Sequence, residues 1–380
     1  MKLLFAADLH MDPLIWRNLP NVLNDSHDSW KQIVKQAIER KVDAVILGGD
    51  VFDRHPPSET VRCFLEGVWK LKHAQIPILA IQGQHGRSHK LAWSSLDPYV
   101  QDLDAATFVT VPLNATATER DFRIAGIDNL PPAQLKERLS ALKPEVNVLV
   151  VHQMIRGMVP SFGGREIWDM DPDWVPNHVK LVLAGDYHSP VARTFKGIKF
   201  KYNGSTVTRS IDEPDEKFFH IVDDDFGIEP VKLSTRTIKR YLLMSDTDVE
   251  EVGKVLAELP LLPDGAVAYI RHHPRISNLE TCCRAANPKV NFLFRPMIIR
   301  TEMVKNEAAP VAKVSLRGCL DRLLEREKDP FLYDFIVDLL ASESPAETVA
   351  VHRHRCLEVV NADVPKIKGP ELLPAPEPGH

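Results

Sequence analysis

Cysteine is scarce in this sequence, and the spacing of the cysteines argues against a common kind of metal site. The chain of 380 residues has five cysteines, at Cys63, Cys282, Cys283, Cys319 and Cys356. None of them forms a Cys-x-x-Cys pair, so we expect no cysteine-based zinc site. An odd number of thiols without pairing is typical of a chain kept in a reducing compartment. We therefore expect an intracellular protein with reduced thiols.

Long apolar runs are absent as well. No stretch approaches the roughly 20 consecutive apolar residues that a membrane-spanning helix needs, so we expect no membrane association. The chain begins with an apolar run that Asp8 and His10 interrupt. We interpret this run as a strand and not as a signal peptide.

The sequence also has no excess of positive charge. Its formal net charge is −5, which argues against a strongly basic, autonomous nucleic-acid binder. DNA remains a possible substrate, because metal ions and local basic patches can supply the positive field. The sequence contains no Gly-x-x-x-x-Gly-Lys-Ser/Thr motif, so any ATP hydrolysis must come from a partner.

What is present is the pattern of an α/β protein. The composition, 44% hydrophobic and 26% charged, is ordinary for a globular chain, and the length predicts two or more domains. Apolar runs predict strands at 3–7, 42–47, 76–81, 107–111, 122–126, 146–151 and 179–184. Helical spacing predicts helices at 28–40, 59–73 and 131–142. The alternation of predicted strands and helices predicts an α/β sheet. Residues 156–176 are expected to form an irregular loop, and short strands are expected to continue to about Leu233.

Residues able to bind metal follow five of these strands at their carboxyl ends, where ligands bind in open α/β sheets. They are Asp8, His10, Asp50, Asp53, Gln84, His85, His152, Asp186 and His188. A single histidine at a strand end is more often a hydrogen-bonded structural residue, but five such strands are improbable by chance. Mixed carboxylate, imidazole and amide donors suit manganese, iron or zinc better than calcium, and there are enough for two ions.

The order of these motifs resembles that of the calcineurin-like metallophosphoesterases. The motifs are Asp8-x-His10, Gly49-Asp50-x-x-Asp53, Gly83-Gln84-His85, His152 and Gly185-x-x-His188. More narrowly, Gly49-Asp50-Val51-Phe52-Asp53, Val151-His152-Gln153 and Tyr202-Asn203-Gly204-Ser205 are similar to motifs of the SbcD nucleases of double-strand-break repair. The resemblance covers about residues 1–235 and implies a two-sheet αββα sandwich that forms a nuclease domain.

The resemblance also implies a mechanism built on two manganese ions. Asp8, His10 and His188 would hold the first ion, Asp50 would bridge both, and Gln84, His152 and Asp186 would complete the second. A metal-activated hydroxide would attack the phosphodiester of DNA. His85 matches the catalytic histidine and would protonate the leaving oxygen, while Asp53 would orient its neighbours.

Three positions depart from the family pattern. Gln84 stands where the family has asparagine, which keeps the carbonyl ligand but adds a methylene group. Gly86 stands where the family has an aspartate that would orient the catalytic imidazole and favour its charged form. Asp186 replaces a histidine, which adds negative charge and a harder ligand. These departures bear on the rate and the metal preference.

The last third of the chain changes pattern. Residues 236–304 are expected to form a small α/β cap domain, with strands at 238–244, 266–271 and 290–300 and helices at 248–259 and 278–286. In the SbcD family an equivalent cap lies over the nuclease domain and helps select DNA. A phosphate-facing surface could be lined by Arg236, Lys239, Arg240 and Arg271. Scattered solvated charges explain these residues equally well.

Two amphipathic helices are expected within 311–345, and a proline-rich disordered tail at 362–380. The helices could pack on their own domain or dock in a partner's groove. By resemblance we favour docking on an SbcC-type ABC/SMC-like ATPase, together with homodimerisation through the nuclease domain. Two other functions stay open: a phosphatase for a small molecule or phosphoprotein, and a structural subunit with a weakened site.

Overall fold

The computed structural model describes residues 2–16, 19, 22–53, 55–85, 97–111, 121–160, 167–245 and 249–297. The chain divides into two units, Met1–Ile299 and Arg300–His380, and every described residue belongs to the first. The predictions for Gly86, for the helices within 311–345 and for the tail at 362–380 lie outside the described residues.

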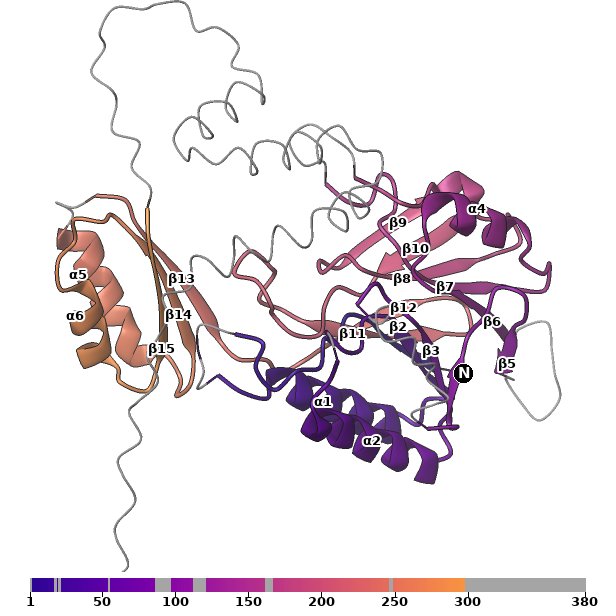
Figure 1. Cartoon of the computed structure of the whole chain (residues 1–380), viewed down its shortest axis with the longest axis horizontal. Coiled ribbons are helices and arrows are strands. Elements are labelled where there is room, and N and C mark those ends of the chain that lie inside the picture. The colour runs from indigo at the N-terminus through magenta and orange to yellow at the C-terminus, as the bar shows by residue number, and fades with distance from the viewer. Residues whose placement is uncertain are drawn as a thin grey trace, which may run out of the picture. The chain divides into compact units, whose positions relative to one another are not determined.

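One six-stranded sheet is built on four parallel strands. Its order is β12-β11-β1-β2-β3-β4 (Figure 1). The parallel strands are β1 (Lys2–Ala6), β2 (Ala44–Gly48), β3 (Ile78–Ile81) and β4 (Val100–Asp102). The antiparallel strands β11 (Phe218–Asp223) and β12 (Ile228–Lys232) complete it on the β1 side. The first, second and third predicted strands are therefore neighbours with their carboxyl ends at one edge.

The second six-stranded sheet has the order β5-β6-β7-β8-β10-β9. Its strands are β5 (Val109–Val111), β6 (Phe122–Ile127), β7 (Val148–His152), β8 (Leu181–Gly185), β9 (Val191–Phe195) and β10 (Ile198–Tyr202). The strands β6, β7, β8 and β10 are parallel. The carboxyl ends of β7 and β8, which carry predicted site residues, thus lie side by side.

Alternating side chains explain how the two sheets pack. In β1, Leu3 and Phe5 face the layer between the sheets, whereas Leu4 and Ala6 pack beneath the helices. The helices α1 (Asp25–Glu39) and α2 (Ser58–His73) cover the outer face of the first sheet, and α4 (Pro132–Ser140) covers that of the second (Figure 1). Apolar residues on both faces of the strands therefore specify a four-layer sandwich.

A smaller parallel sheet follows the sandwich. It contains β13 (Ile238–Leu243), β14 (Val267–His272) and β15 (Asn291–Pro296), and α5 (Val249–Glu258) and α6 (Leu279–Ala286) pack on one face (Figure 1). Two short 3₁₀ helices, Pro172–Trp174 and Leu259–Leu261, occur in connections.

The predicted fold class is confirmed. The predicted helices and most strands agree with the structure to within a few residues; α1 begins at Asp25, earlier than expected, and the three-residue strand β4 was not predicted. The small sheet lies in the same compact unit as the sandwich, so an independent cap domain over 236–304 stays a prediction.

Candidate metal centre

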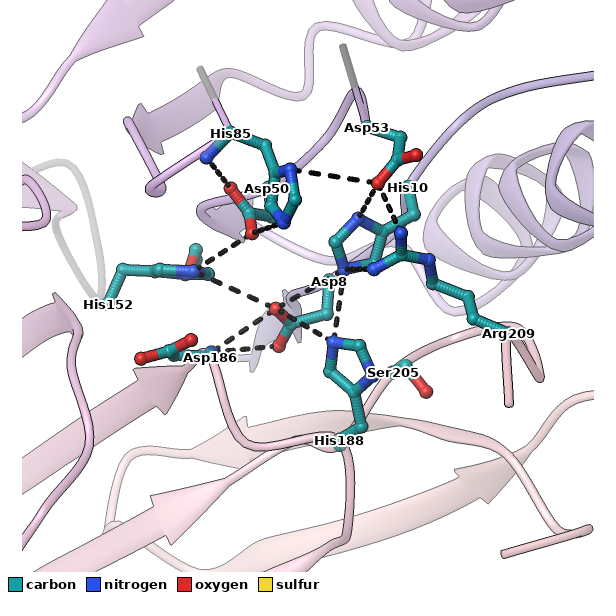
Figure 2. Close-up of polar contacts among 12 residues, drawn as sticks. Asp8, His10, Asp50, Asp53, His85, His152, Asp186, His188, Ser205 and Arg209 are labelled. Carbon is teal, nitrogen blue, oxygen red and sulfur yellow. Dashed lines mark hydrogen bonds and ion pairs between the residues drawn. The ribbon is translucent and has the colours of Figure 1, made fainter. Parts of the chain in front are cut away.

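All the residues predicted to bind metal or act in catalysis lie at or just beyond the carboxyl end of a parallel strand. Asp8 and His10 follow β1, Asp50 and Asp53 follow β2, and His85 follows β3 (Figure 2). From the second sheet, His152 ends β7, and Asp186 and His188 follow β8. Because the two sheets face each other, loops from both meet at one edge of the sandwich.

Several residues of these loops have a positive φ angle. The φ angles are 53° at Asp8, 44° at His10, 46° at Asp50 and 92° at Asp186. Such angles are costly for residues with a Cβ and persist only where the surroundings enforce them. Three backbone hydrogen bonds join the loops after β1 and β2: Asp8 N donates to Gly49 O over 3.1 Å, His10 N to Asp50 O over 2.9 Å, and Met11 N to Val51 O over 2.7 Å.

The first donor group contains Asp8, His10 and His188. The two Nε2 atoms of the histidines lie 3.1 Å apart. They lie 3.8 and 3.9 Å from Asp8 Oδ1. Two imidazole nitrogens and a carboxylate oxygen that converge in this way can share one cation.

The second donor group contains Asp8, Asp50 and His152, all buried. His152 Nε2 lies 3.3 Å from Asp50 Oδ2 and 3.8 Å from Asp8 Oδ1. A third group joins His10 and Asp50 to His85. Asp8 and Asp50 each belong to two groups, so each carboxylate is placed to serve two neighbouring cations.

Hydrogen bonds fix which nitrogen each histidine offers to the centre. His152 Nδ1 donates to Gly48 O over 2.8 Å, which leaves the lone pair on Nε2. That Nε2 atom is buried, and no hydrogen-bond partner meets it among the described residues. Beside two carboxylates this nitrogen attracts a cation, which is a proton in the absence of metal, so the residues present fit a divalent metal ion.

His188 is oriented by a carboxylate that sequence analysis missed. Its Nδ1 donates to Glu213 Oε1 over 2.8 Å, and Glu213 Oε2 accepts from Lys217 Nζ over 2.7 Å. Ser205 Oγ donates to the same oxygen over 3.0 Å. Lys217 is almost fully buried, although it carries a charge. No motif marked Glu213 or Lys217, because the irregular loop that brings them to His188 has no periodicity.

Electrostatics also favour a cation at this position. Burial raises the pKa of the Asp8 carboxyl to about 6 and raises that of Asp186. Burial alone would lower the pKa of His152, but the neighbouring carboxylates of Asp50 and Asp8 raise it to about 10, so this ring takes up a proton when no metal is bound. Crowded carboxylates therefore draw positive charge toward themselves.

Asp53 contacts three cationic or ionisable side chains at the mouth of the cluster. Its Oδ1 lies 3.4 Å from His10 Nδ1 and 3.7 Å from His85 Nδ1, and it forms an ion pair with Arg209 (Figure 2). The interaction with His10, followed by the charges of Arg209 and His85, holds the pKa of Asp53 well below its usual range. His85 is the most exposed of these histidines, at 37% of its side chain.

Two predicted metal ligands, Gln84 and Asp186, belong to none of these donor groups among the described residues. Gln84 is exposed, in contrast to the buried neighbours that it was expected to join. The backbone N–H of Asp186 donates to both carboxylate oxygens of Asp8, at 3.2 and 3.1 Å. Within the described residues, the Asp186 carboxylate belongs to none of the three-residue donor groups. Both assignments therefore stay predictions.

The four basic residues predicted to face DNA have different surroundings. Arg236 forms an ion pair with Asp25 over 2.6 Å, and Arg240 donates to Ile211 O and pairs with Asp215. Lys239 Nζ lies 3.3 Å from Glu258. Arg271 is exposed and lines a cavity of about 1020 Å³. That cavity extends from His10, Asp53 and His188 to Tyr269, Arg271 and Arg295 of the small sheet.

The described helices include none that is long and apolar enough to cross a membrane.

Comparison with known proteins identifies the family of this chain. The family described as calcineurin-like phosphoesterase matches residues 1–190, half of the chain.

Among curated proteins, the DNA double-strand break repair protein Mre11 of Sulfurisphaera tokodaii is 28% identical over 194 residues, or 50% of this chain and 49% of that protein. Mre11 of Methanococcus maripaludis is 24% identical over 380 residues, or 88% of this chain and 98% of that protein. The chain thus spans about half the length of the first of these relatives and nearly all of the second.

A solved structure described as a novel archaeal phosphodiesterase is 13% identical, with a TM-score of 0.34, and covers 61% of this chain and 100% of its own. The family match spans all the strand-end motifs that supply the donor groups, from Asp8 to His188. The chain belongs to the calcineurin-like phosphoesterase family.

Proposed function

We propose that this protein is a metal-dependent nuclease that hydrolyses phosphodiester bonds in DNA. The observation that carries the proposal is the convergence of Asp8, Asp50 and the Nε2 atoms of three histidines at one edge of the sandwich. The names of the relatives, DNA double-strand break repair proteins, support DNA as the substrate. The cavity beside the cluster supports a substrate larger than a free phosphate ion.

Manganese is the metal that we propose. Asp8, His10 and His188 would hold one ion, Asp50 and His152 would hold a second, and Gln84 and Asp186 would complete the set. Mixed carboxylate and imidazole donors favour a transition metal over calcium. When bound, such ions supply a hydroxide at neutral pH and polarise the phosphate oxygens.

The protein's own contribution to bond cleavage is a proton held at His85. Its backbone N–H donates to Asp50 Oδ1 over 2.9 Å, which fixes the residue beside the cluster. Its Nδ1 lies 3.7 Å from Asp53 Oδ1. Asp53 thereby provides the carboxylate that the SbcD nucleases place after the histidine, where this chain has Gly86. From this position His85 would protonate the departing oxygen.

The partners are proposed on resemblance to the SbcD family. We propose that the C-terminal segment binds an SbcC-type ATPase, that the nuclease domain forms a homodimer, and that the complex works in the cytoplasm of a bacterial cell. Co-purification with an ATPase encoded by a neighbouring gene, followed by a cleavage assay with and without ATP, tests the first of these.

A cleavage assay separates the candidate activities. With manganese and the ATPase partner present, we expect release of nucleotides from a DNA hairpin and much slower hydrolysis of p-nitrophenyl phosphate.

Two variants separate metal binding from catalysis. Asp50→Ala should lose both metal and activity. His85→Ala should keep the metal and lose about 10²- to 10⁴-fold in turnover, the usual contribution of a general acid. Faster hydrolysis of the phosphomonoester would indicate a phosphatase, and bound metal without either activity a structural subunit. Full cleavage by His85→Ala would refute the proton-donor role.

A further inference from the structure

Arg209 is a cation in direct contact with two residues of the candidate metal centre. One guanidinium nitrogen, Nη2, forms an ion pair with Asp53. The other, Nη1, lies 3.2 Å from His10 Nε2 (Figure 2). The side chain is 24% exposed and lines the cavity of about 1020 Å³. Among the described arginines and lysines, Arg209 both lines this cavity and contacts residues of the candidate metal centre.

The backbone of Arg209 is held by the same carboxylate that orients His188. Arg209 N donates to Glu213 Oε2 over 3.2 Å. The partners of Glu213 are Lys217 at 2.7 Å and His188 at 2.8 Å. The loop therefore holds the backbone of Arg209, and the ion pair with Asp53 places the guanidinium at the rim of the cluster.

The contact between Arg209 and His10 is incompatible with a metal ligand at the same atom. His10 Nε2 has one lone pair, which can accept from Nη1 or bind a cation, but not both. If His10 binds metal as proposed above, Nη1 loses its acceptor while Nη2 keeps Asp53. A guanidinium has five N–H donors in a plane. Several of them are then available at the wall of the cavity.

Phosphate is the ligand whose chemistry fits these donors. The cluster itself is rich in carboxylates, which repel an anion, so a substrate phosphate needs a cation at the rim. An arginine fork donates two parallel hydrogen bonds to a phosphate. Farther along the cavity, Arg271 and Arg295 are paired positions on β14 and β15, and both are exposed. Their positive charge extends the anion-binding character of this wall.

We propose that Arg209 binds the substrate phosphate at the edge of the metal centre, and that it exchanges His10 for the phosphate when metal is present. This inference rests on the metal centre proposed above. It makes Arg209 a substrate-binding residue, although no motif in the sequence distinguishes it from other arginines.

The test uses the full-length protein loaded with manganese and inorganic phosphate as the probe, with affinity measured by calorimetry. We expect Arg209→Gln to weaken phosphate binding by about tenfold to a hundredfold, the range for a charge-assisted hydrogen bond to a buried site. Arg209→Lys should lie between, because it keeps the charge and loses the fork. Arg138→Gln, an exposed position on α4, is the matched control and should bind phosphate as the wild type does.

Manganese affinity, measured from the electron paramagnetic resonance signal of the free ion, is the second readout. It should be unchanged or tighter in Arg209→Gln, because a competing positive charge has been removed. Wild-type phosphate affinity in Arg209→Gln would overturn the proposal. Loss of manganese binding in both Arg209 variants would also overturn it, since Arg209 would then only support Asp53 and His10. Phosphate binding that depends on Arg209 in a protein that cuts no DNA would leave this assignment standing and refute the nuclease.

Discussion

Glu213 determines how His188 presents its ring. The carboxylate accepts from His188 Nδ1 and is itself held by Lys217 and Ser205, so the Nε2 lone pair of His188 faces His10 and Asp8. Burial would raise the pKa of Glu213, but the hydrogen bond from His188 and the charge of Lys217 lower it to about 2. Glu213 is therefore ionised at neutral pH.

Replacing Glu213 should weaken metal binding without removing any ligand. We expect Glu213→Ala to lower manganese affinity by about tenfold to a hundredfold, as is usual when the partner of a metal-binding histidine is lost. Glu213→Gln should have a smaller effect, because its amide oxygen can still accept from His188. Titration of the apoprotein with manganese measures both. Wild-type affinity in Glu213→Ala would show that the orientation of His188 does not depend on this carboxylate.

The loop after β3 lies so close to the loop after β2 that a side chain at Gly83 would collide with Asp50. A Cβ atom there would lie 2.1 Å from Asp50 Oδ1 and 2.5 Å from Asp50 N. Contacts this short require the backbone or the Asp50 carboxylate to move. Gly83 thus fixes the distance between the donors that follow β2 and β3.

Gly83→Ala should disrupt the centre while the sandwich stays folded. We expect manganese affinity to fall by more than about tenfold, because Asp50 is shared by two donor groups and small displacements matter at such sites. Gly253→Ala is a matched control, since Gly253 lies in α5 and has nothing within 4 Å of the added Cβ. That variant should bind metal normally and gain up to about 1 kcal/mol in stability. Equal metal binding by both variants would contradict the role of Gly83.

The junction between β1 and β11 makes stability depend on pH. His220 on β11 pairs with Phe5, and its Nδ1 lies 2.9 Å from Asn203 Oδ1. Burial, with a smaller contribution from the charge of Lys201, lowers the pKa of His220 to about 3. The folded protein keeps this imidazole neutral at pH values where the unfolded chain, with a pKa near 6.5, takes up a proton.

His220 should therefore stabilise the fold fully above about pH 6.5 and progressively less between pH 6.5 and pH 3. The loss approaches about 1.4 kcal/mol per pH unit for one group. Urea unfolding of wild type and His220→Gln at a series of pH values measures the difference. We expect the destabilisation caused by the substitution to shrink as the pH falls. A difference that is independent of pH would contradict a neutral buried imidazole.

Across the whole molecule, the sequence was most informative where chemistry and periodicity coincide. Apolar runs that end in Asp or His predicted the parallel strands, and parallel strands in two facing sheets bring their ends together, so Asp8, His10, Asp50, His152 and His188 meet. The resemblance, carried by these same residues, led to the family that the comparison confirms.

The residues that support the centre were not predictable in the same way. Arg209, Glu213 and Lys217 lie in an irregular connection, and only the closed fold brings them to His10 and His188. The basic residues were ambiguous because a sequence does not show which of them form ion pairs. The sequence left open whether Arg236 faces phosphate or is a solvated charge, and it gave no sign that this arginine pairs with Asp25 across 211 positions.

The most direct test of the metal centre is anomalous diffraction at the manganese edge from crystals of the full chain soaked in Mn²⁺. We expect two peaks about 3.5–4 Å apart, the usual separation in two-metal sites, one beside His10 and His188 and the other beside His152, with Asp50 between them. A map with no anomalous peak among these side chains, from crystals that diffract well and keep the fold intact, would contradict the assignment.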